Sequence, residues 1–318
     1  MDKKIWIAIG LIIVISVVSL GISIAGFLQA TTEKIEIVEP KVPMESVGFE
    51  GPIYTGTSNG YIIVFENGVT YYLAGDTCLF AGMKFIIGDY YKPDIAFLPI
   101  GDFYTMDSKD AAYATTLINP KFVVPYHYHS FAEMTQNASE FVAGVNEFRD
   151  RGETRAEPVV LEYGVWRELM GIKFLWLGHA SFLIESVNGT RILIDPWLEA
   201  NPDCPAEYKD YTAFDDIDLI LVTHGHVDHV TVDELEKVVN LYDPVVLAQW
   251  ELAEYLDDRI TAPVTIVPFN KGGRVTKENL IRWSYGDEEF IKKIEGMDAN
   301  IKITLVHADH SSSPAFGY

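Results

Sequence analysis

Hydrophobic and polar positions follow three different patterns along the chain. An apolar run without any charged residue covers residues 5–30. Residues 31–47 then mix charges with two prolines and have no sustained periodicity. From residue 48 onward, short apolar runs alternate with turns and amphipathic stretches. The pattern predicts an N-terminal apolar helix over 1–30, a linker over 31–47 and a folded domain over 48–318.

The folded part carries period-two and period-3.6 segments in alternation. Residues 60–75 predict a β-hairpin, because Asn67 and Gly68 supply its turn. Further strands are expected at residues 94–100, 121–127, 158–163, 172–178, 191–197, 218–224, 244–248, 264–269 and 301–307. Helices are expected at residues 108–118, 138–150, 231–242 and 251–258. Hairpins combined with strand–helix alternation indicate an α/β (α+β) fold of layered sheets flanked by helices.

The apolar run at residues 5–30 is long enough to span a bilayer. At ~1.5 Å per residue a helix of this length reaches about 39 Å, more than the ~30 Å hydrocarbon core. The alternative is a cleaved signal peptide, whose apolar region is usually ~7–15 residues with small residues before the cut. Leu28, which is not a small residue, would occupy position −3 relative to a cut after Ala30. We therefore predict one transmembrane helix that anchors the protein.

Flanking charges predict the orientation of this anchor. Lys3 and Lys4 precede the run, whereas Lys34 follows it. Positive charges favour the cytoplasmic side, so the folded domain is expected to be extracytoplasmic. Cys78 and Cys204 could pair in such an oxidising compartment, although their distance in sequence gives no geometric support.

The charge balance excludes one class of partner. The 46 acidic and 24 basic residues give a net charge of −22. An acidic surface repels phosphate backbones, and the sequence contains no basic stripe, so we expect no nucleic acid partner.

Histidines cluster at the ends of the predicted strands. The densest group follows the strand at 218–224 and reads His-Gly-His-Val-Asp-His over residues 224–229. Residues two apart in an extended segment point the same way, so His224 and His226 can hold one metal ion. The following turn can direct Asp228 and His229 at a second ion. Three imidazoles and a carboxylate within six residues predict a metal site.

Other strand ends offer the remaining ligands. Asp76 lies in Gly-Asp-Thr at residues 75–77, His127 and His129 follow the strand at 121–127, and His307 and His310 follow the strand at 301–307. The residues alone leave the choice within each histidine pair open.

Together these segments resemble the metallo-β-lactamase superfamily, and within it the metal-dependent hydrolases related to L-ascorbate-6-phosphate lactonase. The resemblance rests on GHASFLIE at 178–185, IDPW at 194–197, HGHVDH at 224–229, HSSS at 310–313, GDT at 75–77 and HY at 127–128. It implies a four-layer αββα sandwich with a binuclear metal site.

The order of the motifs differs from that of the family. There GHAS comes first and HY last, whereas here GDT and HY precede GHAS. The chain therefore looks circularly permuted: residues 48–164 match the family's C-terminal half and 171–318 its N-terminal half. Residues 165–169 would then be the linker that joins the old termini, and Met170 stands where an ordinary member would start.

The resemblance also implies roles for individual residues. It assigns the metal ligands as follows: His224, His226 and His310 at the first ion; Asp228, His229 and His127 at the second; Asp76 bridging both. Asp195 would orient a ligand by hydrogen bonding. His179, with Asp76 and Asp228, is expected among the catalytic residues, either lining the substrate pocket or making a structural hydrogen bond. Two divalent ions are implied, Zn²⁺ first, with Mn²⁺ or Fe as alternatives.

The function implied is a membrane-anchored hydrolase in which a metal-bridging hydroxide cleaves an ester, lactone, amide or phosphodiester. The alternatives are a phospholipase D-like phosphodiesterase that acts on lipid headgroups and an inactive metal-binding interaction module. A small-molecule or lipid substrate is expected, and a homo-oligomer is compatible with the resemblance. Loops at residues 201–216 and 103–110 would shape the pocket.

Overall fold

The computed structural model of the protein describes residues 55–283, 294 and 300–310. The predicted anchor, the linker at 31–47 and the serines at 311–313 lie outside these residues. Within the described ranges, no helix is long and apolar enough to cross a membrane. All described residues belong to one unit, Phe49–Tyr318.

The described strands form two seven-stranded sheets. The first sheet contains, in spatial order, β13 (Arg274–Thr276), β14 (Lys302–His307), β1 (Asn59–Val64), β2 (Thr70–Leu73), β3 (Ile95–Pro99), β4 (Phe122–Tyr126) and β5 (Glu157–Pro158). The second contains β6 (Trp166–Leu169), β7 (Ile172–Trp176), β8 (Phe182–Glu185), β9 (Arg191–Ile194), β10 (Leu219–Leu221), β11 (Val245–Gln249) and β12 (Thr265–Phe269).

The two sheets share one pattern of strand directions. In each, the first four strands in spatial order pair antiparallel. The fourth strand also pairs parallel with the fifth, and the remaining strands continue in parallel. The second sheet follows the chain from β6 to β12 without interruption. The first sheet instead places β14 beside β1, with His307 opposite Asn59. Segments from the two ends of the described chain are therefore neighbours in this sheet.

Local signals account for the hairpin and for two of the helix starts. Gly68 adopts a φ of +83° in the turn between β1 and β2, where Phe65 N–H donates to Val69 O, which confirms the predicted hairpin. Side-chain oxygens of Asp107 and Thr231 cap two helices. The helices are α3 (Ser108–Ile118), α4 (Ser139–Asp150), α5 (Val232–Tyr242), α6 (Trp250–Asp257), α7 (Lys277–Trp283), the π-helix η1 (Met83–Tyr91) and the 3₁₀-helices η2 (Ala206–Lys209) and η3 (Tyr211–Ala213). The four helices predicted from the sequence are confirmed.

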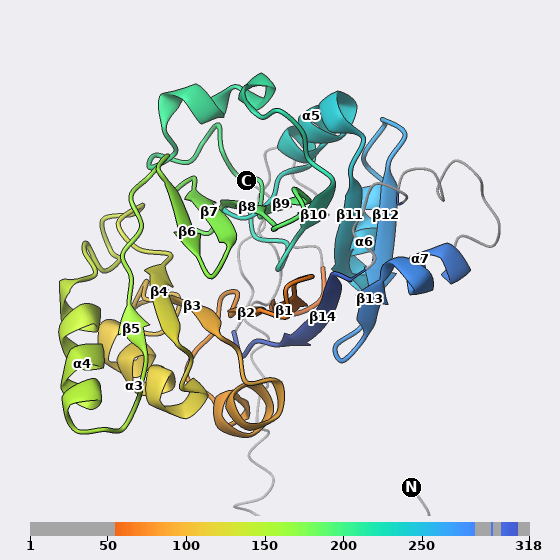
Figure 1. Ribbon diagram of the computed structural model, residues 1–318. Coiled ribbons are helices and arrows are strands. Elements are labelled where there is room, and N and C mark those ends of the chain that lie inside the picture. Colours follow the sequence, from red (N-terminus) through yellow and green to blue (C-terminus); the bar gives the residue numbers. More distant parts are fainter. Residues whose placement is uncertain (1–54, 284–293, 295–299, 311–318) are drawn as a thin grey trace, which may run out of the picture. The chain divides into compact units, whose positions relative to one another are not determined.

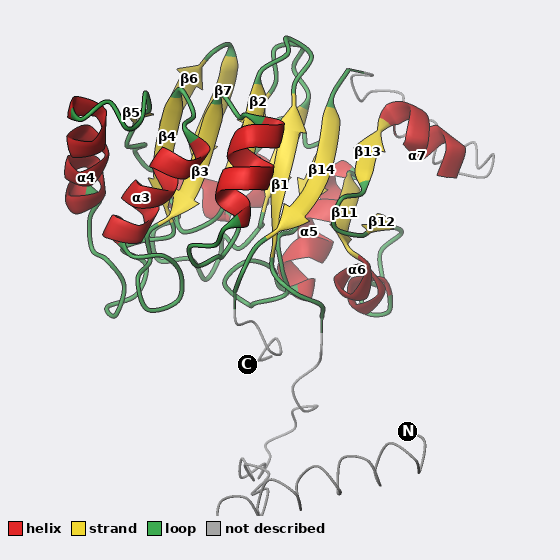
Figure 2. Cartoon of the chain, turned by 90° about the horizontal axis from the view of Figure 1, so that it is seen from below, coloured by secondary structure: helices red, strands yellow, loops and turns green. Residues whose placement is uncertain are grey.

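The sheets pack face to face with helices outside, as expected for a four-layer sandwich (Figures 1 and 2). Helices α3 and α4 cover the first sheet, while α5 and α6 pack with the second sheet in a separate apolar core. Between the sheets, the buried ring of Phe97 lies 5.0 Å from those of Tyr71 and Phe174 and 5.1 Å from that of Phe182. These aromatic contacts fix the two sheets against each other and hold the rim from which the candidate ligands project.

Two segments differ from the prediction. The strand expected at 158–163 pairs only at Glu157–Pro158, because the chain then crosses to the other sheet, where Tyr163 bridges to Trp176. The segment at 165–169, expected as a linker, largely forms β6, which pairs antiparallel with β7. The structure also contains β8, β13, α7 and η1, which the hydrophobic pattern did not reveal.

Candidate metal centre

The predicted ligands come from loops that follow strands of both sheets. Asp76 follows β2, His127 follows β4, and His310 follows β14 in the first sheet. His179 follows β7 and the 224–229 segment follows β10 in the second sheet. Because the sheets face each other, these loops meet at one end of the sandwich, and they form two groups of candidate metal ligands.

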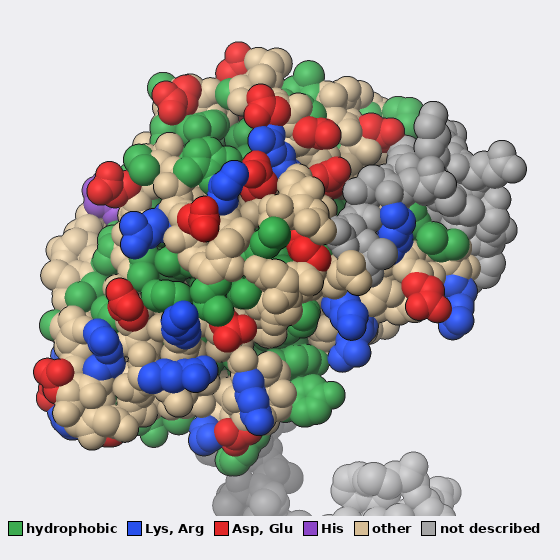
Figure 3. All heavy atoms as spheres, viewed as in Figure 1, with side chains coloured by type: hydrophobic (Ala, Val, Ile, Leu, Met, Phe, Trp, Pro, Cys, Tyr) green, Lys and Arg blue, Asp and Glu red, His purple; other side chains and the backbone are tan. Residues whose placement is uncertain are grey.

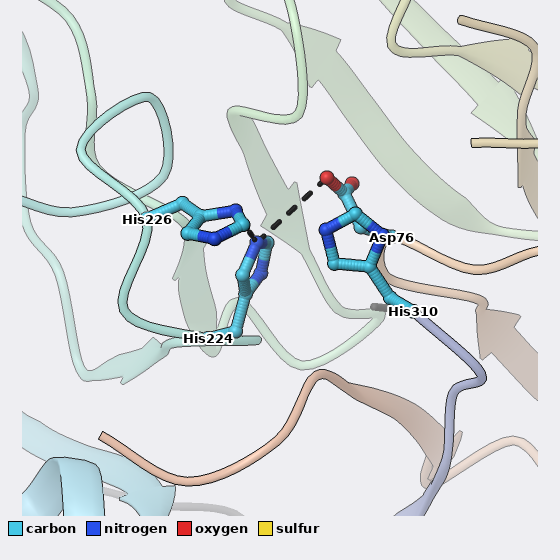
Figure 4. A group of neighbouring side chains, drawn as sticks. All are labelled: Asp76, His224, His226 and His310. Carbon is cyan, nitrogen blue, oxygen red and sulfur yellow. Dashed lines mark hydrogen bonds and ion pairs between the residues drawn. The ribbon is translucent and has the colours of Figure 1, made fainter. Parts of the chain in front are cut away.

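The first group contains Asp76, His224, His226 and His310, whose ligand atoms all lie within 4.8 Å of one another. Nε2 of His224 lies 2.9 Å from Nδ1 of His226 and 3.7 Å from Oδ2 of Asp76. Figure 4 shows the rings of His224 and His226 on one side and His310 beside the Asp76 carboxylate on the other. The four side chains therefore surround a common space.

The second group contains His127, His179, Asp228 and His229, again with ligand atoms within 4.8 Å of one another. Asp76 lies between the groups, since its Oδ2 is 3.1 Å from Nε2 of His127 and 3.3 Å from Nε2 of His229. The same oxygen contacts His224 of the first group. One carboxylate oxygen of Asp76 thus contacts histidines of both groups.

Many of these ligand atoms are buried without a hydrogen bond. Among the described residues they find no hydrogen-bond partner, and they include Asp76 Oδ1, both ring nitrogens of His127, and Nε2 of His179, His229 and His310. A buried polar atom left unpaired costs about 1–3 kcal/mol, so this concentration calls for another partner. Imidazole nitrogens and carboxylate oxygens are the donors that Zn²⁺, Mn²⁺ and Fe accept. The side chains therefore fit divalent cations.

Asp195 belongs to neither ligand group but contacts His229, a member of the second. Its Oδ2 lies 2.8 Å from Nδ1 of His229, and its two oxygens accept hydrogen bonds from the backbone N–H and hydroxyl of Thr223, both at 2.7 Å. Asp195 is 1% exposed, and burial raises the pKa of its carboxyl, although His229 opposes the shift. This is the orienting contact expected for Asp195.

Charges inside the centre are strongly coupled. Burial alone would lower the pKa of His229, but Asp76 and Asp195 outweigh it and raise that pKa well above its usual value. Burial would raise the pKa of Asp76, yet His127 and His229 hold it well below its usual value. Burial and the charge of His229 lower the pKa of His224. In the metal-free protein, two carboxylates thus favour the protonated ring of His229, with Asp195 at Nδ1 and Asp76 at Nε2.

Asp228 and His179 form a second coupled pair. Burial would raise the pKa of Asp228, but the close contact with His179 and the charge of His229 lower it below its usual value. Burial lowers the pKa of His179 to about 4. His179 is fully buried and has a left-handed backbone, with φ +50°.

The structure separates the members of each histidine pair. His310 belongs to the first ligand group and His127 to the second. By contrast, His129 lies 2.7 Å from Asp203, and His307 lies 3.1 Å from the ammonium of Lys271. Both cysteines carry free thiols, exposed at Cys78 and buried at Cys204.

Sequence reasoning missed several neighbours of the centre. Gly101 packs so closely that an added Cβ would lie 2.6 Å from Nδ1 of His127. Ser130 contacts His179, and Asp203 contacts Ser130. The ring of Phe131 lies near those of His179 and Trp197, at 5.7 and 6.1 Å. None of these residues belongs to a ligand-like spacing, so only the folded loops reveal them.

Comparisons with known proteins find similarity over part of the chain. Residues 173–290 match the family described as the beta-lactamase superfamily domain. UPF0173 metal-dependent hydrolases are similar to the chain: one from Koribacter versatilis is 46% identical over 107 residues, 32% of this chain and 45% of the relative. One from Roseiflexus castenholzii is 53% identical over 138 residues, 43% of this chain and 47% of the relative.

A third relative, from Chloroflexus aurantiacus, is 36% identical over 132 residues, which are 39% of this chain and 53% of the relative. The chain therefore spans about half the length of the curated relatives it matches. Among solved structures, a metallo hydrolase from Ignicoccus hospitalis matches at 38% identity and a TM-score of 0.29, over 34% of this chain and 47% of that one. Residues 173–290 are thus similar to a beta-lactamase superfamily domain, and the described residues form a mixed α/β fold with two sheets.

Proposed function

We propose that the protein is a binuclear metal-dependent hydrolase that cleaves an ester, lactone or phosphodiester. The observation that carries the proposal is the meeting of two ligand groups at Asp76. His224, His226 and His310 would hold the first ion, and Asp228, His229 and His127 the second. The names of the similar UPF0173 proteins support the reaction class.

The protein's own residues prepare the centre in specific ways. The lowered pKa of Asp76 keeps it a carboxylate at neutral pH, as a bridging ligand must be. Asp195 accepts the Nδ1 proton of His229 and so directs Nε2 toward Asp76. When bound, two divalent ions would lower the pKa of a water between them and stabilise negative charge developing on the substrate. Phe131 and Trp197 would exclude water beside His179.

Metal analysis of the purified full-length chain, followed by hydrolysis assays on phosphodiesters, lactones and esters, tests the proposal. We expect about two equivalents of metal and hydrolysis of at least one probe class. His224→Ala combined with His226→Ala should lower the metal content by about one equivalent and abolish hydrolysis. His307→Ala, a histidine outside both groups, is the matched control and should retain both. Unchanged metal content and hydrolysis in the double variant would overturn the assignment, and full metal content without any hydrolysis would favour the inactive binding module.

A second candidate is a phosphodiesterase that acts on lipid headgroups. Exposed aromatic residues favour it, since Phe103 is 78% exposed and Tyr104 is 46% exposed. Both lie in the loop that begins with Gly101, the residue that packs against His127. Aromatic side chains at such a position suit a membrane interface. Vesicles of phosphatidylethanolamine and phosphatidylcholine, compared with soluble phosphodiesters, distinguish the two candidates.

Circular permutation of a lactonase-related hydrolase is part of the proposal. Its support is the strand order, in which the second sheet follows the chain and the first sheet joins β14 to β1. A reordered chain, with residues 170–318 placed before residues 48–164, is expected to fold and bind the same amount of metal. A reordered chain that does not fold would argue against the permutation.

The remaining proposals concern location and partners. We propose that residues 5–30 anchor the protein in a membrane with the domain outside, which fractionation and protease protection of intact cells can test. The proposed partners exclude nucleic acid, consistent with the net charge of −22 and with the interspersed acidic and basic side chains on the face in Figure 3. A homo-oligomer is proposed as well, and sedimentation in detergent measures it.

A further inference from the structure

A chain of polar contacts reaches His179 from the loop after β9. Asp203, whose side chain is 6% exposed, lies 2.7 Å from Nδ1 of His129 through Oδ1. Its Oδ2 accepts a hydrogen bond from the Ser130 hydroxyl at 2.7 Å. The Ser130 oxygen in turn lies 3.1 Å from Nδ1 of His179. Asp203 and Ser130 thus connect His179 to the loop after β9.

The direction of these hydrogen bonds selects one tautomer of His179. A carboxylate only accepts, so the single hydroxyl proton of Ser130 is committed to Asp203. The Ser130 oxygen then offers only lone pairs to His179, and Nδ1 of His179 must donate to it. A neutral imidazole has one N–H, so Nε2 carries a lone pair.

That lone pair points at another acceptor. Nε2 of His179 lies 3.2 Å from Oδ2 of Asp228, and it is buried without a hydrogen-bond partner among the described residues. Two acceptors at this distance repel each other unless a cation lies between them. The other ligand atoms of the second group lie within 4.8 Å. The arrangement is that of a metal ligand.

The backbone holds His179 in this place. Its carbonyl oxygen accepts hydrogen bonds from the Trp176 indole at 3.0 Å and from the His127 N–H at 3.2 Å. A Cβ on the preceding Gly178 would lie 2.8 Å from the backbone carbon of Asp203, so the two loops pack in direct contact. The loop that carries Asp203 therefore sets the position of His179 as well as its protonation.

We propose that His179 binds the second metal ion through Nε2, and that Asp203 and Ser130 are positioning residues that select the required tautomer. This inference rests on the proposed function, because it presumes a metal ion at the second group. It adds a fourth side chain to His127, Asp228 and His229, and it gives the 201–216 loop a role in metal binding.

The test measures metal binding in the full-length chain, without an activity assay. Co²⁺ is titrated into the metal-free protein, visible absorption bands are recorded, and affinities are obtained by competition with a chelator. His179→Ala should change the bands of one equivalent only. Asp203→Ala frees the Ser130 proton to turn toward His179, and it should weaken one equivalent by about 10–100-fold. Ser130→Ala should act similarly, and Ser130→Thr, which retains the hydroxyl, should restore the affinity.

Asp215→Ala is the matched control, because this carboxylate is 88% exposed and pairs with Arg191 away from both ligand groups. It should leave both equivalents unchanged. If wild-type protein binds two equivalents and His179→Ala alters neither bands nor affinity, His179 only donates a hydrogen bond to Asp228 and the inference is overturned. If wild-type protein binds no Co²⁺, the proposed function itself fails, and the inference fails with it.

Discussion

Asp195 and His229, 34 residues apart in sequence, are joined by a buried contact of 2.8 Å between Oδ2 and Nδ1. The same carboxylate accepts two hydrogen bonds from Thr223, the residue before His224. One side chain thus fixes both the 224–229 loop and the ring orientation of His229. Asp195 has a φ of +45°, a conformation that aspartate and asparagine tolerate better than most residues.

Asp195→Asn should therefore weaken metal binding while preserving the backbone. The asparagine oxygen can still accept from the Thr223 N–H, but the amide N–H group then faces Nδ1 of His229. Nδ1 must accept that hydrogen bond, so the proton of the neutral His229 ring moves to Nε2. We expect about a 10–100-fold loss of affinity, measured by chelator competition. Asp218→Asn, a partly buried carboxylate that accepts from the Arg191 N–H on the same sheet, is the control. Equal affinities in wild type and Asp195→Asn would show that the contact does not orient His229.

Metal binding should depend on pH through His229. Its pKa is raised, so its extra proton stays bound above the usual value of ~6.5 and must leave when a metal ion binds. Metal affinity should rise with pH until the pKa of His229 is passed. The proton's contribution to stability in the metal-free protein behaves oppositely: it is fully present below ~6.5 and is lost as pH rises through the raised pKa.

Calorimetric titrations in buffers of different ionisation enthalpy measure the protons released by metal binding. At pH 7 we expect proton release that diminishes in alkaline solution. Binding without proton release at pH 7 would contradict a protonated His229 in the metal-free protein.

Gly101→Ala should disturb the centre without removing a ligand. The new Cβ would lie 2.6 Å from both Nδ1 and the carbonyl oxygen of His127, so the histidine must move. We expect metal affinity to fall by about tenfold or more, because ligands displaced by fractions of an ångström bind poorly. Gly152→Ala is the control: its φ of +72° strains an alanine, but no atom lies within 4 Å of the added Cβ. That variant should lose stability and keep its metal affinity.

Phe97→Ala should destabilise the contact between the sheets. Its ring is fully buried against Tyr71, Phe174 and Phe182, so truncation leaves a cavity. We expect the free energy of unfolding to fall by about 3–5 kcal/mol in urea denaturation. Phe85→Ala, at a ring that is 68% exposed, should change it by less than about 0.5 kcal/mol. Similar losses in both variants would contradict a core at Phe97.

The sequence predicted the elements whose periodicity is long or whose turns are marked. The helix at Ser108–Ile118 and the hairpin around Gly68 are examples, since a capping aspartate and a turn glycine lie at their ends. The π-helix Met83–Tyr91 escaped prediction because it is short and a glycine interrupts its apolar run. That residue, Gly88, packs against the neighbouring α3, where a Cβ would meet Leu117 O at 2.3 Å. Tertiary packing decides such a segment.

Candidate ligands were predictable where several ligand-type side chains lie close together in sequence, as in residues 224–229. The role of His179 was not, because it depends on a left-handed backbone and on hydrogen bonds to Ser130 and thereby to Asp203, 24 residues further along the chain. Asp203 has no pattern that distinguishes it from other loop carboxylates in an acidic chain.

The distribution of the ligand groups over both sheets has a mechanical consequence. Asp76, His127 and His310 extend from the first sheet, while His179 and the 224–229 loop extend from the second. Ions held between them would act as a removable cross-link that closes long loops of the chain, and such closure restrains the unfolded state most when the loops are long. Metal supply would then set how long the folded domain survives proteolysis, in addition to whether it can perform chemistry.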